Sequence, residues 1–206
     1  MPVILSTAYL PPIEFFKHLK REDEVLLEKF ETYPKQTYRN RCIILTANGP
    51  LALTIPVVKP NGNRTIIKDV RIDNSVKWRK EHWRAMESAY RSSAFFEFIY
   101  DYLLPYYSKD WDFLWDFNLS IISTISDVLD ISVTLKETKL YSPSPEGYVD
   151  LRNSISPKAK YFDTTGINSN TYYQVFGSRF GFVPSLSILD LLCNCGMESI
   201  LYLNIE

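Results

Sequence analysis

The sequence predicts a single α/β domain over residues 1–206, with a mixed sheet that includes an antiparallel meander and is flanked by helices. Three observations lead to this prediction. The chain opens on a strand–loop–helix–strand pattern, an Asn48-Gly49 pair marks a tight hairpin, and later segments carry apolar residues at helical spacing. The length is enough to bury a substantial core, and we find no repeat or linker that divides the chain.

The first 30 residues carry the α/β signal. Val3-Ile4-Leu5 predicts a short buried strand. Two successive prolines then turn the chain, and the second, Pro12, suits the start of a helix over residues 13–20. Residues 24–30 predict a second strand. A strand, a helix and a strand in this order are typical of an α/β sheet.

A meander is predicted next. Its hairpin pairs residues 41–46 with residues 51–57, because the Asn-Gly pair between them supplies positive φ angles. A second turn at Asn61-Gly62-Asn63 leads into a strand over residues 65–72. Pro56 lacks an amide donor, so its strand is bulged there or lies at an edge.

Two helices and one further strand follow. A polar cap at Asn74 or Ser75 starts a long helix over residues 76–104, which the next proline ends. Apolar residues at helical spacing predict a second helix over residues 111–129, and residues 131–135 predict a strand.

The last third of the chain is less regular. Residues 141–170 are rich in Ser, Pro, Thr, Asn and Gly, and long segments of this kind often form lids or binding loops. A short helix then starts at Ser185 or Ser187 and is closed by Gly196.

Composition excludes several classes of protein. A net charge of −1 argues against the basic surface of a nucleic-acid-binding protein. The three cysteines show no zinc spacing, and we expect free thiols and no metal site. No secretion signal or membrane-spanning run is present, so we expect a cytoplasmic protein. The sequence identifies neither a cofactor nor an oligomeric state.

A polar segment at residues 35–42 is the strongest candidate for a binding site. In an extended strand its cations would share one face and its other polar residues the opposite face. These two groups are Lys35, Arg39 and Arg41, and Gln36, Tyr38 and Asn40. Guanidinium groups bind carboxylates or phosphates bidentately, which favours an anionic small molecule. The alternative is a structural ion pair with acidic residues such as Glu28, Asp69 or Asp73.

The two histidines are candidate acid/base groups. His82 shares a predicted helix face with Trp78, which indicates either a core-facing stripe or the mouth of a cleft. His18 lies four residues after Glu14, at a spacing that suits either a surface ion pair or a proton-transfer pair.

Asp190 lies in the nearly all-apolar C-terminal helix. It either belongs to a Ser-x-x-Asp cap with Ser187 or is a buried carboxylate with a raised pKa. No phosphate loop, dinucleotide fingerprint or nucleophile elbow is present.

The chain resembles the WbqC-like family, named after a member from an O-antigen gene cluster. The matching segments are YLPPIEFF (9–16), KQTYRNRC (35–42), LTIPV (53–57), WRKEHW (78–83), AY (89–90), YYQVFG (172–177) and FVPSLSILDLL (182–192). Longer relatives usually have His-Gln-Pro where this chain has Ser6-Thr7-Ala8, and more sequence around residues 141–170. The resemblance implies a context of surface-polysaccharide or sugar-nucleotide modification.

We therefore weigh two functions. The first is a transferase-type enzyme acting on a sugar nucleotide or acyl donor. Its predicted catalytic residues are His82 and Asp190. Its predicted substrate-binding residues are Gln36, Tyr38, Arg39, Asn40, Arg41, Trp78, Tyr173 and Gln174. The second is a non-catalytic ligand-binding or scaffold protein that uses the same polar segment.

Overall fold

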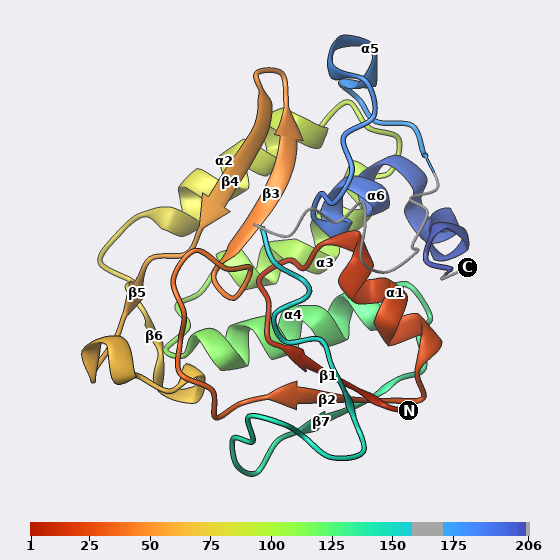
Figure 1. The fold of residues 1–206 in the computed structure, drawn as a ribbon. Helices are drawn as coiled ribbons and strands as arrows, with labels where there is room; N and C mark the ends of the chain where they lie inside the picture. Colours follow the sequence, from red (N-terminus) through yellow and green to blue (C-terminus); the bar gives the residue numbers. More distant parts are fainter. Residues whose placement is uncertain (158–170, 205–206) are drawn as a thin grey trace.

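A four-stranded parallel sheet with helices on one face confirms the α/β class (Figure 1). The computed structural model describes residues 1–157 and 171–204. The strands, in spatial order, are β7 (Thr134–Glu137), β2 (Glu24–Glu28), β1 (Val3–Ser6) and β8 (Val149–Asp150). Each adjacent pair is parallel, so all four carboxyl ends meet at one edge.

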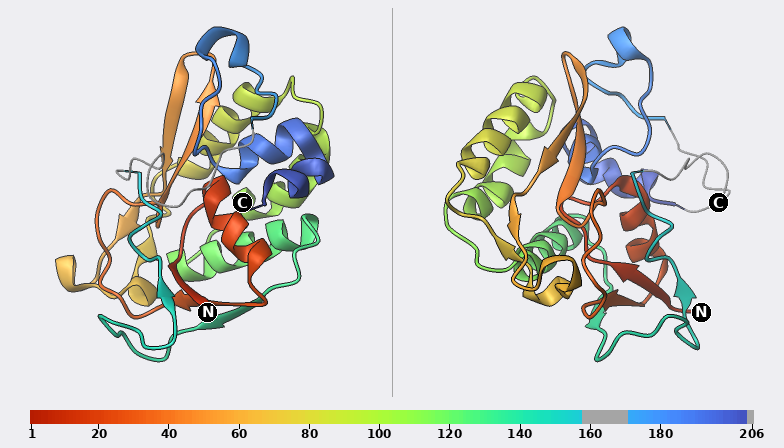
Figure 2. Two further views of the ribbon diagram at one scale, coloured as in Figure 1. Left: turned by 45° about the vertical axis from the view of Figure 1, so that its right-hand side comes forward. Right: turned by 60° about the vertical axis from the view of Figure 1, so that its left-hand side comes forward.

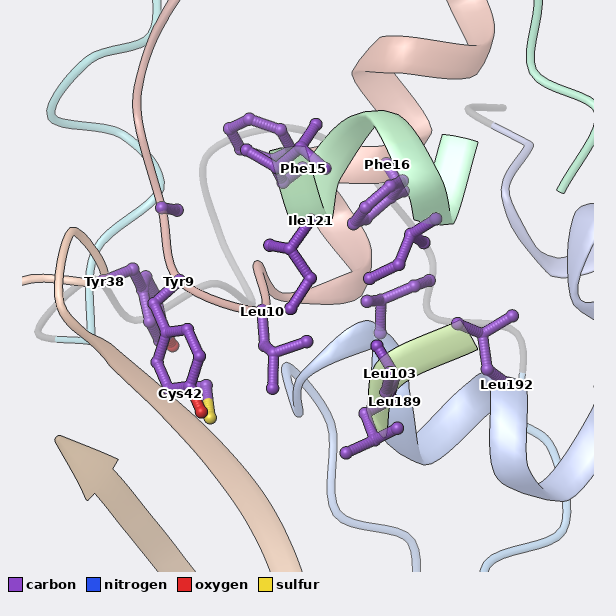
Figure 3. Close-up of a cluster of buried hydrophobic side chains, with 14 of the residues drawn as sticks. Tyr9, Leu10, Phe15, Phe16, Tyr38, Cys42, Leu103, Ile121, Leu189 and Leu192 are labelled. Atoms are coloured by element: carbon purple, nitrogen blue, oxygen red, sulfur yellow. The ribbon is translucent and has the colours of Figure 1, made fainter. Parts of the chain in front are cut away.

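One face of this sheet is part of the hydrophobic core. Successive residues of a strand point to opposite faces, and Leu5 and Leu27 turn inward. They join the apolar faces of α1 (Ile13–Arg21) and α4 (Leu114–Val128) in one buried cluster, part of which Figure 3 shows. The opposite, outer face carries Ile4 and is faced by the segment that follows β7.

The predicted hairpin is confirmed as β3 (Arg41–Thr46) and β4 (Gly49–Thr54). Gly49 has a φ of 101°, which the turn requires and glycine adopts without strain. Figure 2 shows the hairpin beside α2 (Trp78–Tyr90) and apart from the parallel sheet. The meander prediction for residues 65–72 is largely wrong. These residues contain a 3₁₀ turn (Ile67–Asp69), and β6 (Arg71–Ile72) pairs with β5 (Val57–Val58), while Ile66 forms an isolated bridge with Thr32.

The predicted helix over residues 76–104 is two helices, α2 and α3 (Phe96–Tyr107). Ser93 ends the first because both its amide and its hydroxyl donate to the carbonyl of Tyr90. The amide of Phe95 then donates to Cys193 in the C-terminal helix. Pro105 lies inside α3, two residues before its end, and does not stop it at Leu104.

The polar segment before β3 is not a strand. Residues 35–40 form bends and a turn, with Gln36 at a φ of 58°. The carbonyl of Tyr38 accepts hydrogen bonds from the amides of Tyr9 and Arg41. These bonds replace the ladder that a strand would need, so the predicted alternation of two polar faces does not occur.

The C-terminal part packs on the core. α5 (Gly177–Phe180) is followed by α6 (Ile188–Cys195) and a 3₁₀ helix (Gly196–Tyr202). The predicted start and end of α6 are confirmed, because Ser187 caps it and Gly196 terminates it at a φ of 55°. β8 lies within the predicted irregular segment 141–170, of which residues 158–170 lie outside the described part. No helix in the described residues has the length and apolarity needed to cross a bilayer.

Candidate functional site

His82 is enclosed by aromatic side chains. Its Nδ1 lies 2.9 Å from the hydroxyl of Tyr9, which is 2.7 Å from the hydroxyl of Tyr107. The ring of Trp78 meets the imidazole edge-on at 5.2 Å. Burial lowers the pKa of His82 to about 4, although a hydrogen bond to the backbone of Thr54 acts in the opposite direction and raises it. The imidazole is therefore neutral at pH 7.

His82 and Trp78 therefore lie on a core-facing stripe of α2, the first of the two arrangements considered from the sequence. His82 and Trp78 are only 5% and 1% exposed, and neither lies at a cleft mouth. The structure gives His82 a clear packing role, while a catalytic role stays a prediction. His18 is also buried, but Glu14 does not pair with it, and both its ring nitrogens lack hydrogen-bond partners among the described residues.

Arg39 is held by a buried carboxylate. Its Nε and Nη2 donate to the two oxygens of Glu31 at 2.7 and 2.5 Å, and Nη2 also donates to the hydroxyl of Ser6 at 2.6 Å. This bidentate contact is the geometry expected for binding a ligand anion, but Glu31 already occupies it. Arg39 therefore forms a structural ion pair, the alternative to ligand binding that the sequence left open. Its partner is Glu31, and not one of the acidic residues considered from the sequence.

The remaining members of the polar segment do not converge. Asn40 is buried and donates to the carbonyl of Ile55 at 2.7 Å, while Tyr38 is buried in the core cluster. Gln36 is exposed, and Arg41 is half-buried with its Nε 3.2 Å from the hydroxyl of Thr54. Their substrate-binding roles stay predictions, although the strand that was to align them is absent.

Asp190 is the buried carboxylate of the second alternative. Its Oδ2 accepts from the hydroxyl of Tyr172 at 2.7 Å and from Nε2 of Gln174 at 3.2 Å. Burial raises its pKa, and these hydrogen bonds oppose the rise. The cap interpretation is wrong for its side chain, because the amide of Ser187, which a capping carboxylate would accept, donates instead to the carbonyl of Ile43 at 2.8 Å.

Asp190 and Gln174, predicted separately as a catalytic and a substrate-binding residue, are thus brought together in one small network. Gln174 also binds both backbone groups of Val183, at 2.8 and 2.9 Å, so the network fastens the segment before α6. Tyr173 is 72% exposed and points away from this network. No contact joins the network to His82 or Arg39 among the described residues.

A second buried ion pair lies at the carboxyl edge of the sheet. Arg152 donates to Glu28 at 2.9 Å and binds Asp150 through two nitrogens, at 2.9 and 2.6 Å. The other oxygen of Glu28 accepts from the hydroxyl of Thr138. Sequence reasoning missed this group because its members are up to 124 residues apart. A strand ending in an acidic residue, as β2 does, was the available signal.

A cavity of about 560 Å³ lies against the outer face of the sheet. Its floor is formed by side chains of β1, β2 and β7, and its wall by the segment between β7 and β8, which loops beneath the sheet in Figure 1. The lining residues are Ile4, Leu26, Glu28, Lys136, Glu137, Thr138, Lys139, Leu140, Ser142, Ser144, Pro145, Glu146 and Tyr148. It is large enough for a small organic ligand.

Two of the acidic residues that line this cavity, Glu28 and Glu137, are already neutralised by partners, whereas Glu146 has no ion-pair partner among the described residues. Glu28 pairs with Arg152, and the carboxylate of Glu137 accepts from Lys29 at 2.6 Å and Trp115 at 3.1 Å. Lys139 is exposed and has no ion-pair partner among the described residues. No group of three or more His, Cys, Asp or Glu side chains suited to a metal ion occurs there or elsewhere in the described part.

Comparison with known proteins identifies the family. The chain is 31% identical over 227 residues to an uncharacterized protein of Mycobacterium tuberculosis, Rv1507c, with 97% of this chain and 96% of that protein covered. No solved structure matches. A model of the WbqC-like protein family matches residues 7–160. Because this match covers most of the fold described above, the chain belongs to the WbqC-like protein family.

Proposed function

We propose that the protein is a transferase-type enzyme that binds an activated anionic metabolite in the outer-face cavity. The observation that carries this proposal is the position of the cavity, against the carboxyl half of a parallel sheet. Ligands of α/β proteins bind outside the carboxyl ends of such strands. The volume of about 560 Å³ falls in the range of small-molecule sites.

The lining supports a ligand with an anionic and an uncharged part. Lys139 offers an ammonium group, and Ser142 and Ser144 offer hydroxyls on the same segment. Ile4 and Leu26 give an apolar floor on which a sugar or acyl group can pack. Sugar nucleotides and acyl donors such as acyl-CoA combine these features.

The family supports the cellular context. The namesake of the WbqC-like family belongs to an O-antigen gene cluster, which favours surface-polysaccharide biosynthesis. Sugar nucleotides and acyl-CoA are cytoplasmic metabolites, and we place the protein in the cytoplasm for that reason.

The alternative is a non-catalytic ligand-binding or scaffold protein. One observation favours it: His82 is enclosed in the core and Arg39 is held by Glu31, so neither supplies a free group to the cavity. A catalyst needs a proton-transfer group within reach of its substrate. Lys139, Glu146 and Tyr148 are the titratable lining groups without an ion-pair partner among the described residues.

A thermal-shift screen with nucleotide sugars, acyl-CoA and nucleoside phosphates tests the proposal. A ligand stabilises the folded state in proportion to the logarithm of its concentration over its dissociation constant. Leu26→Trp should fill the cavity floor and abolish the shift, whereas Leu51→Trp, at an exposed position on β4, should not. Equal shifts in both variants, or no shift with any of these ligands, would contradict the proposed site.

Turnover separates the two functions. The stabilising donor is incubated with the protein and followed by NMR, with the Leu26→Trp variant as the control. Consumption that depends on an open cavity supports the transferase, and binding without consumption supports the non-catalytic alternative.

A further inference from the structure

Helix α3 presents an aromatic row to the surface. Phe98 and Tyr102 are 43% and 42% exposed, and their spacing of four residues places them on one side of the helix. Phe95, the residue before α3, is 39% exposed, and its ring lies beside Gly196. The rings of Phe98 and Tyr102 meet edge-on at 5.2 Å, which makes a continuous apolar surface. Exposed apolar patches of this kind mark interaction sites.

A groove of about 330 Å³ adjoins the C-terminal end of this row. Its lining includes Tyr102 and Pro105 from α3 and Trp111 from the following loop. Trp111 stacks on Tyr106 with the rings nearly parallel, at 5.8 Å and 7°. The groove can therefore receive one large apolar side chain, as a rigid pocket at an interface does.

Charges of opposite sign flank the aromatic row. Glu97 and Asp101 lie on α3 and are exposed, without ion-pair partners among the described residues. Lys109 follows the helix and is also exposed, with its ammonium group 4.5 Å from the centre of the Trp111 ring. Glu97 and Lys109 thus lie toward opposite ends of the same surface, while Asp101 lines the groove together with Lys109.

We infer that this surface binds a second copy of the chain, with the two α3 helices antiparallel about a two-fold axis. With the axis near Leu103, Glu97 lies six residues before it and Lys109 six residues after it. At 1.5 Å per residue, Glu97 is roughly 9 Å from the axis. Lys109, which follows the end of α3 at Tyr107, lies on the other side of the axis, so Glu97 of each copy faces Lys109 of the other. In the same register Phe98 faces the groove of the partner.

A single register therefore satisfies both the charge and the shape of the surface. This self-complementarity is the property of an isologous interface, in which one patch meets its own copy. It favours a second copy over an unrelated protein, which would have to supply both an apolar anchor and the matching charges. One helix face and one groove suit a dimer that exchanges with monomer. The inference does not depend on the proposed ligand.

Analytical ultracentrifugation of the full chain over a micromolar concentration series tests the dimer. The wild type should sediment as a dimer at the high end of the series, and Phe98→Glu should be monomeric throughout with an unchanged melting temperature. Phe180→Glu, a similarly exposed position on α5, is the matched control and should dimerise like the wild type. A monomeric wild type, or dimerisation unaffected by Phe98→Glu, overturns the inference.

Charge reversal tests the register. Glu97→Lys and Lys109→Glu should each weaken dimerisation at least tenfold, and the two changes together should restore it. Failure of the double variant to recover overturns the antiparallel register. Binding of monomeric wild type to anionic lipid vesicles, abolished by Phe98→Glu, would assign the same surface to a membrane and also overturn the dimer.

Discussion

Replacement of Arg39 by methionine distinguishes a structural arginine from a ligand-binding one. The guanidinium is 4% exposed and makes two hydrogen bonds to Glu31 and one to Ser6. Methionine keeps most of the length and apolar volume of the side chain. The change therefore removes the charge and its hydrogen bonds while leaving the carboxylate of Glu31, itself 7% exposed, without its partner.

We expect Arg39→Met to lower the free energy of unfolding by about 3–5 kcal/mol, because one partner of a buried ion pair is lost. This is a large share of the roughly 5–15 kcal/mol that stabilises a typical protein. For a chain of this length it corresponds to a fall in melting temperature of roughly 6–20 °C. Adding Glu31→Leu removes the orphaned charge, so the double variant should be more stable than Arg39→Met alone.

Urea unfolding followed by circular dichroism measures these differences, and Arg41→Met is the control. Arg41 is half-buried, and the one hydrogen bond that its guanidinium makes among the described residues, to the hydroxyl of Thr54, is solvent-exposed, so its loss should cost about 1 kcal/mol or less. The reasoning is refuted if Arg39→Met is as stable as the wild type. Loss of ligand-induced stabilisation in such a stable variant would restore Arg39 to the binding role expected from sequence.

Three further predictions concern buried groups. Burial lowers the pKa of both His18 and His82 to about 4 in the folded protein, so that as pH falls these histidines are protonated in the unfolded chain before they are protonated in the folded one. The free energy of unfolding should therefore fall as pH drops from about 6.5 to 4, by up to about 3 kcal/mol per histidine. Urea unfolding midpoints measured across this pH range check the prediction. Both ring nitrogens of His18 lack hydrogen-bond partners among the described residues, so His18→Leu should raise the free energy of unfolding by about 1–2 kcal/mol and reduce its dependence on pH. A pH profile of stability unchanged by the substitution would contradict this prediction. Gly196→Ala should lower the free energy of unfolding by about 2 kcal/mol or more, because the φ of Gly196 is 55° and the added carbon would lie 2.5 Å from the Phe95 ring. Thermal unfolding measures this effect, and an unchanged stability would show that the Phe95 ring can move.

Local signals in the sequence were sufficient for much of the fold. The apolar run Val3-Ile4-Leu5, the proline before α1 and the Asn-Gly turn are each signals within a few residues, and all were confirmed. The serine cap and Gly196 likewise located α6. These features depend on backbone conformation and hydrogen bonds close along the chain, which a single sequence shows directly.

The errors arose where distant contacts decide the structure. Residues 35–40 have a strand-like composition, but the carbonyl of Tyr38 binds the amide of Tyr9, 29 positions earlier in the chain, and the segment turns. The long helix breaks before Phe95 because its amide reaches Cys193. Partners so far apart leave no periodic pattern in the sequence.

The candidate site shows the same division. Arg39 was correctly singled out as unusual, since a guanidinium in an apolar context needs a partner, but its partner could be a ligand or an acid. Only coordinates distinguish the two, and they place Glu31 there. Arg152 was not considered because it lies in a segment whose composition indicates a loop.

Under the proposed function, the two buried ion pairs favour recognition of the ligand by the loop after β7. Arg39–Glu31 and Arg152–Glu28 place four charges around the carboxyl ends of β1 and β2, and each is neutralised inside the protein. A ligand competing for either arginine would leave a buried carboxylate unpaired, at a cost of several kcal/mol. Binding at Lys139 carries no such cost, because that ammonium is exposed and has no ion-pair partner in the described chain. Polar residues beside the strands thus stabilise the sheet edge, and under the proposed function the surrounding loop determines which anion is bound.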